Sequence, residues 1–269
     1  MKKKRILVLS DLHCGHAFGL TPPAYQTPLT PGLNDEDGDP YGLWQKAAIM
    51  QREMWEFVVG LVSRRKFDVC VLNGDAVDGK GEKSGGTELL TTDRKRQADM
   101  AAAVLRAVKA DVTFMTFGTP YHTGTSEDWE LSVCDKYPVE RIRSQLFLEA
   151  FGVIFDFRHH IGGTSVPYGV HTAPTKQRII NVLAADQGQV PRADITVRSH
   201  VHRFQYEETR SGASLTTPGL QAYTKFGARR CDGDIDIGLS WFDVYEDGTV
   251  NHTVELLEME CRKPKPISV

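Results

Sequence analysis

Short hydrophobic runs alternate with helix-like segments over the first 122 residues of the chain. Residues 6–9, 69–72 and 112–117 are almost continuously hydrophobic, which is typical of strands that are buried on both faces. Residues 44–66 and 98–108, which lie between these runs, carry their hydrophobic side chains at helical spacing. The order strand, helix, strand, helix, strand predicts a parallel sheet with crossover helices.

The second half of the chain favours strands. An Asp247-Gly248 pair separates the last two hydrophobic tracts, and such a pair is typical of a hairpin turn. The pattern shows no internal repeat and no second domain boundary, so we expect a single domain over residues 1–269. The expected elements are a helix at 175–185 and strands at 153–160, 168–171, 195–197, 204–208, 214–217, 235–245 and 250–257.

Two polar segments interrupt this pattern. Residues 14–43 are rich in Pro, Thr, Gly and Asp, and we interpret them as an insertion loop. Residues 79–91 form a second loop that is rich in glycine and charge. Long connections in a domain are often functional, so we expect both segments to wall the site and to select the substrate.

Side chains that can bind metals follow four of the predicted strands directly. In open α/β sheets, ligands bind beyond the carboxyl ends of the strands, so these side chains should meet at one edge. Imidazole and carboxylate together suit Zn, Mn, Fe or Ni, and two ions about 3.5–4 Å apart can activate a water and clamp a phosphate. The residues are Asp11, His13, Asp75, His122, His200 and His202.

The composition is that of an ordinary soluble protein. Hydrophobic residues make up 41% and charged residues 25% of the 269 residues, which excludes a disordered, collagen-like or coiled-coil chain. The 32 Lys and Arg residues against 35 Asp and Glu residues give a net charge of −3, so the chain as a whole does not attract nucleic acid. A local basic cluster at Lys80, Lys83, Arg94, Lys95 and Arg96 leaves a nucleic-acid partner open.

The five cysteines are scattered and form no CxxC pair, so a disulfide framework or a zinc knuckle is not expected. Scattered cysteines without a pairing motif fit a protein of a reducing compartment. No tract approaches the roughly 20 apolar residues of a membrane span, and the first apolar run is too short for a signal peptide. We therefore expect a cytoplasmic protein without a membrane partner. The sequence says nothing about the oligomeric state.

The order of five short motifs resembles the calcineurin-like metallophosphoesterase superfamily, over residues 5 to about 220. The family pattern runs Asp-x-His, Gly-Asp, Gly-Asn-His-Asp/Glu, a lone His, and Gly-His-x-His. The resemblance implies a four-layer α/β/β/α sandwich with the metals at the carboxyl ends of the strands. The matching segments are Asp11-Leu12-His13, Gly74-Asp75, residues 118–122, Val170-His171-Thr172 and Ser199-His200-Val201-His202.

The resemblance also implies a role for each matching residue. One metal would be held by Asp11, His13, Asp75 and His202, and a second by Asp75, His171 and His200, so that Asp75 bridges the two. His122 matches the family histidine that stabilises the transition state or protonates the leaving oxygen. The implied cofactors are two divalent ions from among Mn, Fe, Ni, Zn and Mg.

The chain departs from the family pattern after its third strand. The family asparagine is absent, and Thr119, Tyr121 or a water would take its place. No acidic residue follows His122 directly, although Glu127, Asp128 and Glu130 lie downstream and one of them could orient its ring or reach a metal. This departure resembles divergent members found in phage and prophage genomes.

These features predict a phosphoester hydrolase that uses a metal-bound hydroxide, most simply a phosphodiesterase or phosphatase for a nucleotide-type or other phosphoester. A nuclease that acts on DNA or RNA is the alternative within the enzyme class, and a non-catalytic metal-binding scaffold is the alternative outside it. The basic residues Lys225, Arg229 and Arg230 are candidates for binding the substrate phosphate.

Several other polar residues near the motifs have simpler interpretations. Asp78 is expected to be a loop or capping residue. His159 and His160 fall on a predicted strand and are expected to be structural or exposed. His16 lies close to His13 in the sequence and is a weaker candidate for the wall of the site.

Overall fold

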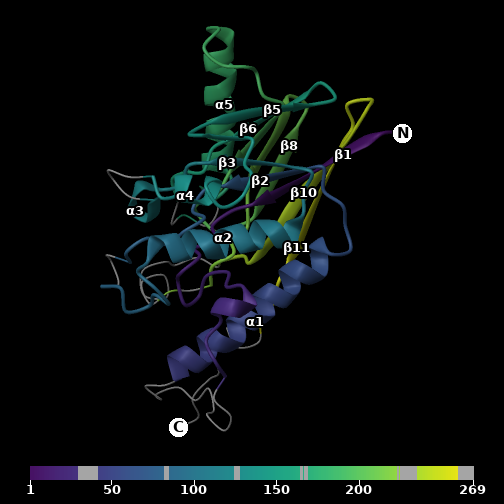
Figure 1. Ribbon diagram of the computed structural model, residues 1–269. Coiled ribbons are helices and arrows are strands. Elements are labelled where there is room, and N and C mark those ends of the chain that lie inside the picture. The colour runs from purple at the N-terminus through teal and green to yellow at the C-terminus, as the bar shows by residue number, and fades with distance from the viewer. Residues whose placement is uncertain are drawn as a thin grey trace, which may run out of the picture.

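The computed structural model describes residues 1–29, 42–81, 85–123, 128–163, 166, 169–222, 224 and 235–259. Figure 1 shows strands at the centre, the helices α1 and α2 on one side of them and α5 on the other. The strands form a six-stranded sheet and a five-stranded sheet.

The first sheet has the order β11-β10-β1-β2-β3-β4. Strands β1 to β4 are parallel, as the alternation of strands and helices predicts, while β10 and β11 are antiparallel to their neighbours. The turn at Asp247-Gly248 joins the antiparallel pair, where Gly248 has a φ of +83° and the Thr249 N–H donates to Asp247. The bounds are β1 Lys3–Leu9, β2 Val69–Asn73, β3 Val112–Thr116, β4 Arg141–Arg143, β10 Gly238–Tyr245 and β11 Val250–Leu256.

The second sheet has the order β5-β6-β7-β9-β8. Its three central strands, β6, β7 and β9, are parallel, and the two edge strands are antiparallel to their neighbours. The bounds are β5 Leu146–Ala150, β6 Val153–Phe157, β7 Ile195–Arg198, β8 Gln205–Thr209 and β9 Gly212–Thr216.

The two sheets pack face to face through one hydrophobic cluster. Ile6, Val8 and Phe242 of the first sheet are buried against Phe155 and Phe157 of the second. The rings of Phe155 and Phe242 meet edge to face with their centroids 5.1 Å apart. Each fully buried side chain of this size contributes about 1.5–3 kcal/mol, so this cluster holds the sheets in one relative position.

The helices complete the layers. Helices α1 (Gly42–Val62) and α2 (Arg94–Val108) cover the outer face of the first sheet, where their apolar sides meet Leu7, Leu9 and Cys70. Helix α5 (Thr172–Asp186) lies against β7 and β9 of the second sheet. The order helix, sheet, sheet, helix confirms the four-layer α/β/β/α prediction. The remaining helices are short: η1 Pro23–Tyr25, α3 Pro120–Thr123 and α4 Leu131–Cys134.

One predicted strand is wrong. Residues 169–171 form a turn before α5 instead of a strand. Helix α5 also begins at Thr172, before its predicted start at residue 175, because a proline such as Pro174 is tolerated in the first turn of a helix, where its missing N–H costs nothing. The strand predicted over 153–160 ends earlier, at Phe157, and strands β4 and β5 are missing from the sequence-based prediction.

The insertion at 14–43 is described only as far as residue 29. Its first part is buried and packs against the segment that follows β2, since the Cys14 N–H donates to Ala76 and the Ala17 N–H to Glu88. Among the helices of the described residues, none has both the length and the apolar character that crossing a membrane requires.

Candidate metal centre

Strands of both sheets end at one edge of the sandwich. Asp11 follows β1, Asp75 follows β2, and His159 follows β6, while His200 and His202 follow β7. Together with His13 and His122 these side chains supply three groups of metal-competent atoms, each group lying within 4.8 Å. The groups are Asp11, His13 and His202; His13, Asp75 and His122; and Asp75, His159 and His200.

The first group is compact. The Nε2 atom of His202 lies 3.1 Å from Oδ1 of Asp11 and 3.3 Å from Nε2 of His13. The His13 Nε2 atom lies 3.9 Å from the same Asp11 oxygen. Two imidazole nitrogens and one carboxylate oxygen therefore face one point.

The group of Asp75, His159 and His200 is built around Asp75. Its Oδ2 atom lies 3.0 Å from Nε2 of His159 and 3.9 Å from Nδ1 of His200. The hydroxyl oxygen of Thr119 lies 3.2 Å from Asp75 Oδ2 and 3.1 Å from His200 Nδ1. Of the alternatives for the missing family asparagine, the structure thus brings the Thr119 hydroxyl into this group.

Asp75 joins the two groups. Its Oδ2 atom also lies 4.0 Å from Nε2 of His13, which belongs to the first group. The other oxygen, Oδ1, accepts the backbone N–H of Thr119 at 2.7 Å. This places one carboxylate between the two sets of nitrogens, as a bridging ligand requires.

The donor set fits metal ions. The buried atoms Asp11 Oδ1 and His159 Nε2 form no hydrogen bond of good geometry, although His202 Nε2 lies 3.1 Å from the first and Asp75 Oδ2 lies 3.0 Å from the second. Ligand atoms about 2.1 Å from one ion lie roughly 3.0–3.4 Å from each other, which matches the shortest separations in both groups. Cations bound among these ligand atoms would satisfy both Asp11 Oδ1 and His159 Nε2.

Neighbouring groups fix the orientation of the imidazoles. The Nδ1 atom of His13 lies 3.0 Å from Oδ1 of Asp78, and that of His159 lies 2.8 Å from the carbonyl oxygen of Asn73. Because these oxygens accept, each Nδ1 carries the proton and Nε2 is directed into the centre. Asp78, which the sequence suggested to be a loop or capping residue, is therefore buried beside the centre and orients His13.

His122, which shares a group with His13 and Asp75, lies on α3. Its Nδ1 atom donates to the carbonyl oxygen of Asp78 at 3.0 Å, and its ring meets the ring of His13 edge to face at 4.5 Å. The side chain remains 17% exposed, whereas that of His13 is only 3% exposed. His122 therefore reaches the centre from the side that solvent can enter.

The facing histidines and carboxylates of the centre shift each other's pKa values. Burial on its own would raise the pKa of Asp11 and of Asp75, but the facing histidines hold both pKa values below the usual range. Burial lowers the pKa of His159, but Asp75 and Asp11 outweigh it and raise that pKa to about 10. Burial likewise lowers the pKa of His202, and Asp11 outweighs it. Protonated histidines thus supply the positive charge that the two carboxylates need.

Backbone strain is concentrated here. Seven non-glycine residues of the described chain have positive φ, and five of them belong to the centre. Such conformations cost of order 1–3 kcal/mol each and persist where the surroundings impose them, commonly at functional sites. The five residues are Asp11, His13, Asp75, His200 and His202.

A buried carboxylate supports the loops below Asp75. Glu130 accepts the backbone N–H of Ala76 at 3.0 Å and that of Gly118 at 2.6 Å. Burial, followed by the charge of Asp75, raises the pKa of Glu130 to about 7. Of the acidic residues downstream of His122, Glu130 thus holds backbone, Asp128 is exposed, and Glu127 lies outside the described residues.

His159, and not His171, lies in the group with Asp75 and His200. His171 is exposed and precedes the first residue of α5, and it belongs to none of the three groups. His159 is buried, and its expected place on a strand is wrong because β6 ends two residues before it. The signal that would have found it is the rule already used for the other residues, a histidine directly after a buried parallel strand.

The other candidates lie further out or outside the described chain. His16 is buried, and its Nδ1 accepts the backbone N–H of Phe18 at 3.1 Å. His160 is exposed, with its ring 4.8 Å from that of His200. Lys225, Arg229 and Arg230, the candidates for phosphate binding, lie outside the described residues.

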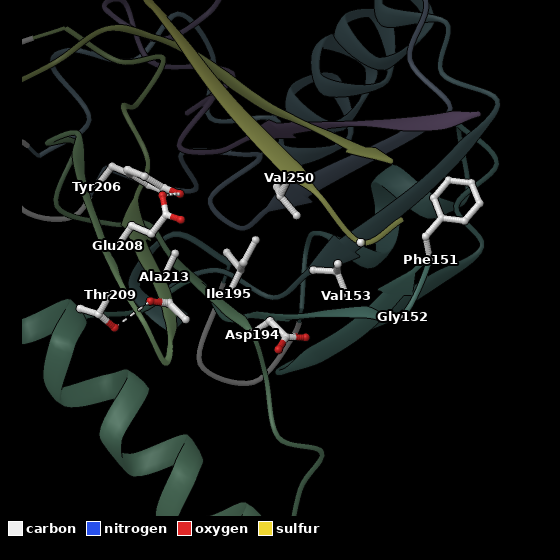
Figure 2. A pocket seen from close by; sticks show the side chains of 12 residues that line it. Phe151, Gly152, Val153, Asp194, Ile195, Tyr206, Glu208, Thr209, Ala213 and Val250 are labelled. Carbon is white, nitrogen blue, oxygen red and sulfur yellow. Dashed lines mark hydrogen bonds between the residues drawn. The ribbon is translucent and has the colours of Figure 1, made fainter. Parts of the chain in front are cut away.

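A cavity of about 410 Å³ lies at the opposite end of the sandwich (Figure 2). Its wall includes Val153, Ile195 and Ala213, which stand at the amino ends of β6, β7 and β9. Its carboxylates have partners, since Asp194 accepts the Ile154 N–H and Glu208 accepts the Tyr206 hydroxyl. The cavity therefore takes no part in the metal centre.

No protein-family model matches the sequence, and no curated protein matches it. Several solved structures are similar in fold. An archaeal phosphodiesterase has a TM-score of 0.47 at 12% identity, over 93% of this chain and 99% of its own. Vps29 from Entamoeba histolytica in complex with zinc has a TM-score of 0.42 at 10% identity, over 94% and 98%.

A predicted phosphoesterase from Streptococcus pneumoniae has a TM-score of 0.38 at 12% identity, over 96% of this chain and 99% of its own. At these identities and TM-scores, any conclusion about activity depends on the centre of this chain itself. In the order of its motifs, the chain resembles the calcineurin-like phosphoesterases.

Proposed function

We propose that this protein is a metal-dependent phosphoester hydrolase, a phosphodiesterase or phosphatase with a two-metal centre. The observation that carries the proposal is the convergence of two buried carboxylates and the imidazoles of five histidines at ligand-type separations, with two of their atoms forming no hydrogen bond of good geometry. Buried charges are costly unless they are paired or bind metals, and the histidines that pair the carboxylates here stand where bound cations would take over that role.

The residues divide into two sets of ligands. Asp11, His13 and His202 would hold one ion, and His159, His200 and the Thr119 hydroxyl would hold the other, with Asp75 shared. The mixture of imidazole and carboxylate suits Mn, Fe, Ni or Zn, and Mg is a further candidate. Bound ions would supply charge neutralisation for the phosphate and lower the pKa of water.

His122 would handle the proton of the leaving group. Hydrolysis adds water across the P–O bond, so the departing oxygen must gain a proton. The Nδ1 proton of His122 is held by the Asp78 carbonyl, so that in the imidazolium form Nε2 would give its proton to that oxygen and the ring would be left neutral. The basic residues Lys225, Arg229 and Arg230 remain candidates for contacts with the substrate phosphate.

Metal analysis followed by hydrolysis assays tests the proposal. The purified chain is loaded with Mn, Ni, Zn or Mg and assayed with bis-p-nitrophenyl phosphate and with p-nitrophenyl phosphate. We expect metal-dependent hydrolysis that the Asp75→Asn variant loses and the Asp128→Asn variant keeps, since Asp128 is an exposed carboxylate.

The outcomes separate the alternatives. Activity on the diester alone favours a phosphodiesterase. Metal-dependent cleavage of DNA or RNA that is faster than hydrolysis of the diester favours the nuclease. Metal binding without hydrolysis of any phosphoester contradicts the proposal and favours a scaffold. Full activity of Asp75→Asn with unchanged metal content contradicts the assignment of the site.

A further inference from the structure

Helix α5 exposes its apolar side to solvent. Ile179, Ile180 and Leu183 are 52%, 46% and 57% exposed, and the helical repeat places all three on one face. The other large hydrophobic residues exposed in the described chain are spread over separate elements. In Figure 1, α5 stands at the periphery of the molecule, away from α1 and α2. A clustered apolar face of this kind is typical of a protein interface.

The opposite side of α5 is held by polar contacts. Asn181 is buried, accepts the Ala193 N–H at 2.9 Å and donates to the Pro191 carbonyl at 3.1 Å. Arg178 donates to the Ser211 hydroxyl, and Thr175, at the edge of the helix next to Ile179, donates to the Glu207 carboxylate. The sheet beneath contributes a buried ion pair between Arg198 and Asp156. These contacts fix which side of the helix faces the sheet, so the apolar side is left for another surface.

Charges at the two ends of the apolar face identify the partner. Lys176 precedes it and Asp186 follows it, and both residues are exposed. Arg192 of the same chain lies 3.9 Å from Asp186, and because both side chains are more than 60% exposed, this contact leaves Asp186 accessible to a second partner. When two copies of α5 cross antiparallel at the level of Asn181, Lys176 of one copy comes level with Asp186 of the other. The same arrangement brings Ile179 level with Leu183. The face is thus complementary to itself in both charge and apolar character, as a two-fold interface requires.

We propose that two copies of this chain associate through α5 as a two-fold dimer, with the helices antiparallel. The apolar side chains form the centre of the interface and the Lys176–Asp186 pairs its ends. A single helix face is small beside the 1,200–2,000 Å² of a standard stable interface, so the dimer dissociates at low protein concentration. The metal centre lies on other elements, so each copy retains a complete centre.

Sedimentation velocity of the full chain over a range of concentrations tests the proposal. We expect reversible dimerisation that Ile180→Lys weakens by about tenfold or more, as truncation of a central interface residue does. The control is Leu131→Lys on α4, where Leu131 is 46% exposed, the same as Ile180. Because both positions are on the surface, neither variant should prevent folding.

Charge reversals at Lys176 and Asp186 provide the second test of the dimer. Lys176→Asp and Asp186→Lys should each weaken the dimer, and the double variant should restore it, because only antiparallel self-association pairs these two positions. A chain that remains monomeric at all concentrations overturns the proposal and assigns the face to a different partner. A dimer that responds equally to Leu131→Lys and Ile180→Lys, or that the double variant does not restore, overturns it as well.

Discussion

The Nδ1 atom of His13 lies 3.0 Å from a carboxylate oxygen of Asp78, and both side chains are buried. The same Asp78 oxygen lies 3.5 Å from Nδ1 of His122, and Gln221 donates to it at 3.3 Å. Asp78 therefore supports both a candidate ligand and the candidate proton donor without belonging to any of the three metal-competent groups.

Replacing Asp78 with asparagine should weaken metal binding. The ring of His13 loses the negative charge that fixes its tautomer and raises its basicity, and such losses typically cost 10–100-fold in metal affinity. Isothermal titration of the metal-free protein measures the change, with Asp128→Asn as the exposed control. Equal affinities for wild type and Asp78→Asn would show that Asp78 supports only the loop.

The assignment of His159 in place of His171 gives a second prediction. His159→Ala should reduce the bound metal, because Nε2 of His159 lies 3.0 Å from Asp75, whereas His171→Ala should leave it unchanged, because His171 is exposed at the start of α5. Elemental analysis after dialysis measures both variants. The reverse result would restore the ligand set that the sequence motifs imply.

These two histidines show what the sequence could and could not predict. Asp11, Asp75 and His200 were found because each follows a hydrophobic run whose end is sharp. His159 follows a strand whose hydrophobic pattern continues past its true end, so the sequence placed His159 inside the strand. The role of Thr119 depends on the folded loop after β3, and no local pattern encodes its distances to Asp75 and His200.

The layers of the fold were more predictable than their edges. Buried parallel strands such as β1 and β2 are continuous hydrophobic runs, which stand out in a single sequence. The short strand β4 reads Arg-Ile-Arg and carries too little pattern to be recognised. Its pairing with β3 is a product of tertiary packing.

Metal binding should release protons. Asp75 and Asp11 outweigh burial and raise the pKa of His159 to about 10, so the metal-free protein holds a proton there at pH 7 that a metal must displace. Metal affinity should therefore rise with pH between pH 6 and 9, by up to about tenfold per pH unit for each displaced proton. Titrations in buffers of different ionisation enthalpy count the protons. His159→Gln should release fewer, and an equal count in both proteins would contradict the linkage.

Gly118 should tolerate no side chain. A Cβ atom there would lie 2.2 Å from Oδ1 of Asp75 and 2.3 Å from its backbone nitrogen, so Gly118→Ala must displace Asp75. We expect loss of metal binding in a protein that still folds, measured by titration and circular dichroism. The matched control is Gly60→Ala in α1, where a Cβ meets nothing within 4 Å. That change should stabilise the chain by about 0.5–1 kcal/mol, because glycine weakens a helix interior.

His252 should make stability depend on pH away from the metal centre. Its ring packs among Phe204, Tyr206 and Phe242 with centroids 5.7, 4.7 and 4.8 Å away, and its buried Nε2 has no hydrogen-bond partner. Burial lowers its pKa to about 4, below the ordinary value near 6.5. The unfolded chain therefore gains a proton at a higher pH than the folded chain does. The stability that neutral His252 contributes is complete above pH 6.5 and is lost as the pH falls through 4.

Urea unfolding at pH 7 and at pH 4.5 measures this contribution. The wild type should lose about 2 kcal/mol more than His252→Leu over this interval, since leucine retains the apolar packing and does not titrate. Acid also titrates the histidines of the metal centre, but that loss is common to both proteins and cancels in the difference. Between pH 7 and pH 8 the free energies of unfolding of the two proteins should change with pH by the same amount. A wild type and a variant that lose equal stability between pH 7 and 4.5 would show that His252 is solvated enough to gain its proton in the folded chain.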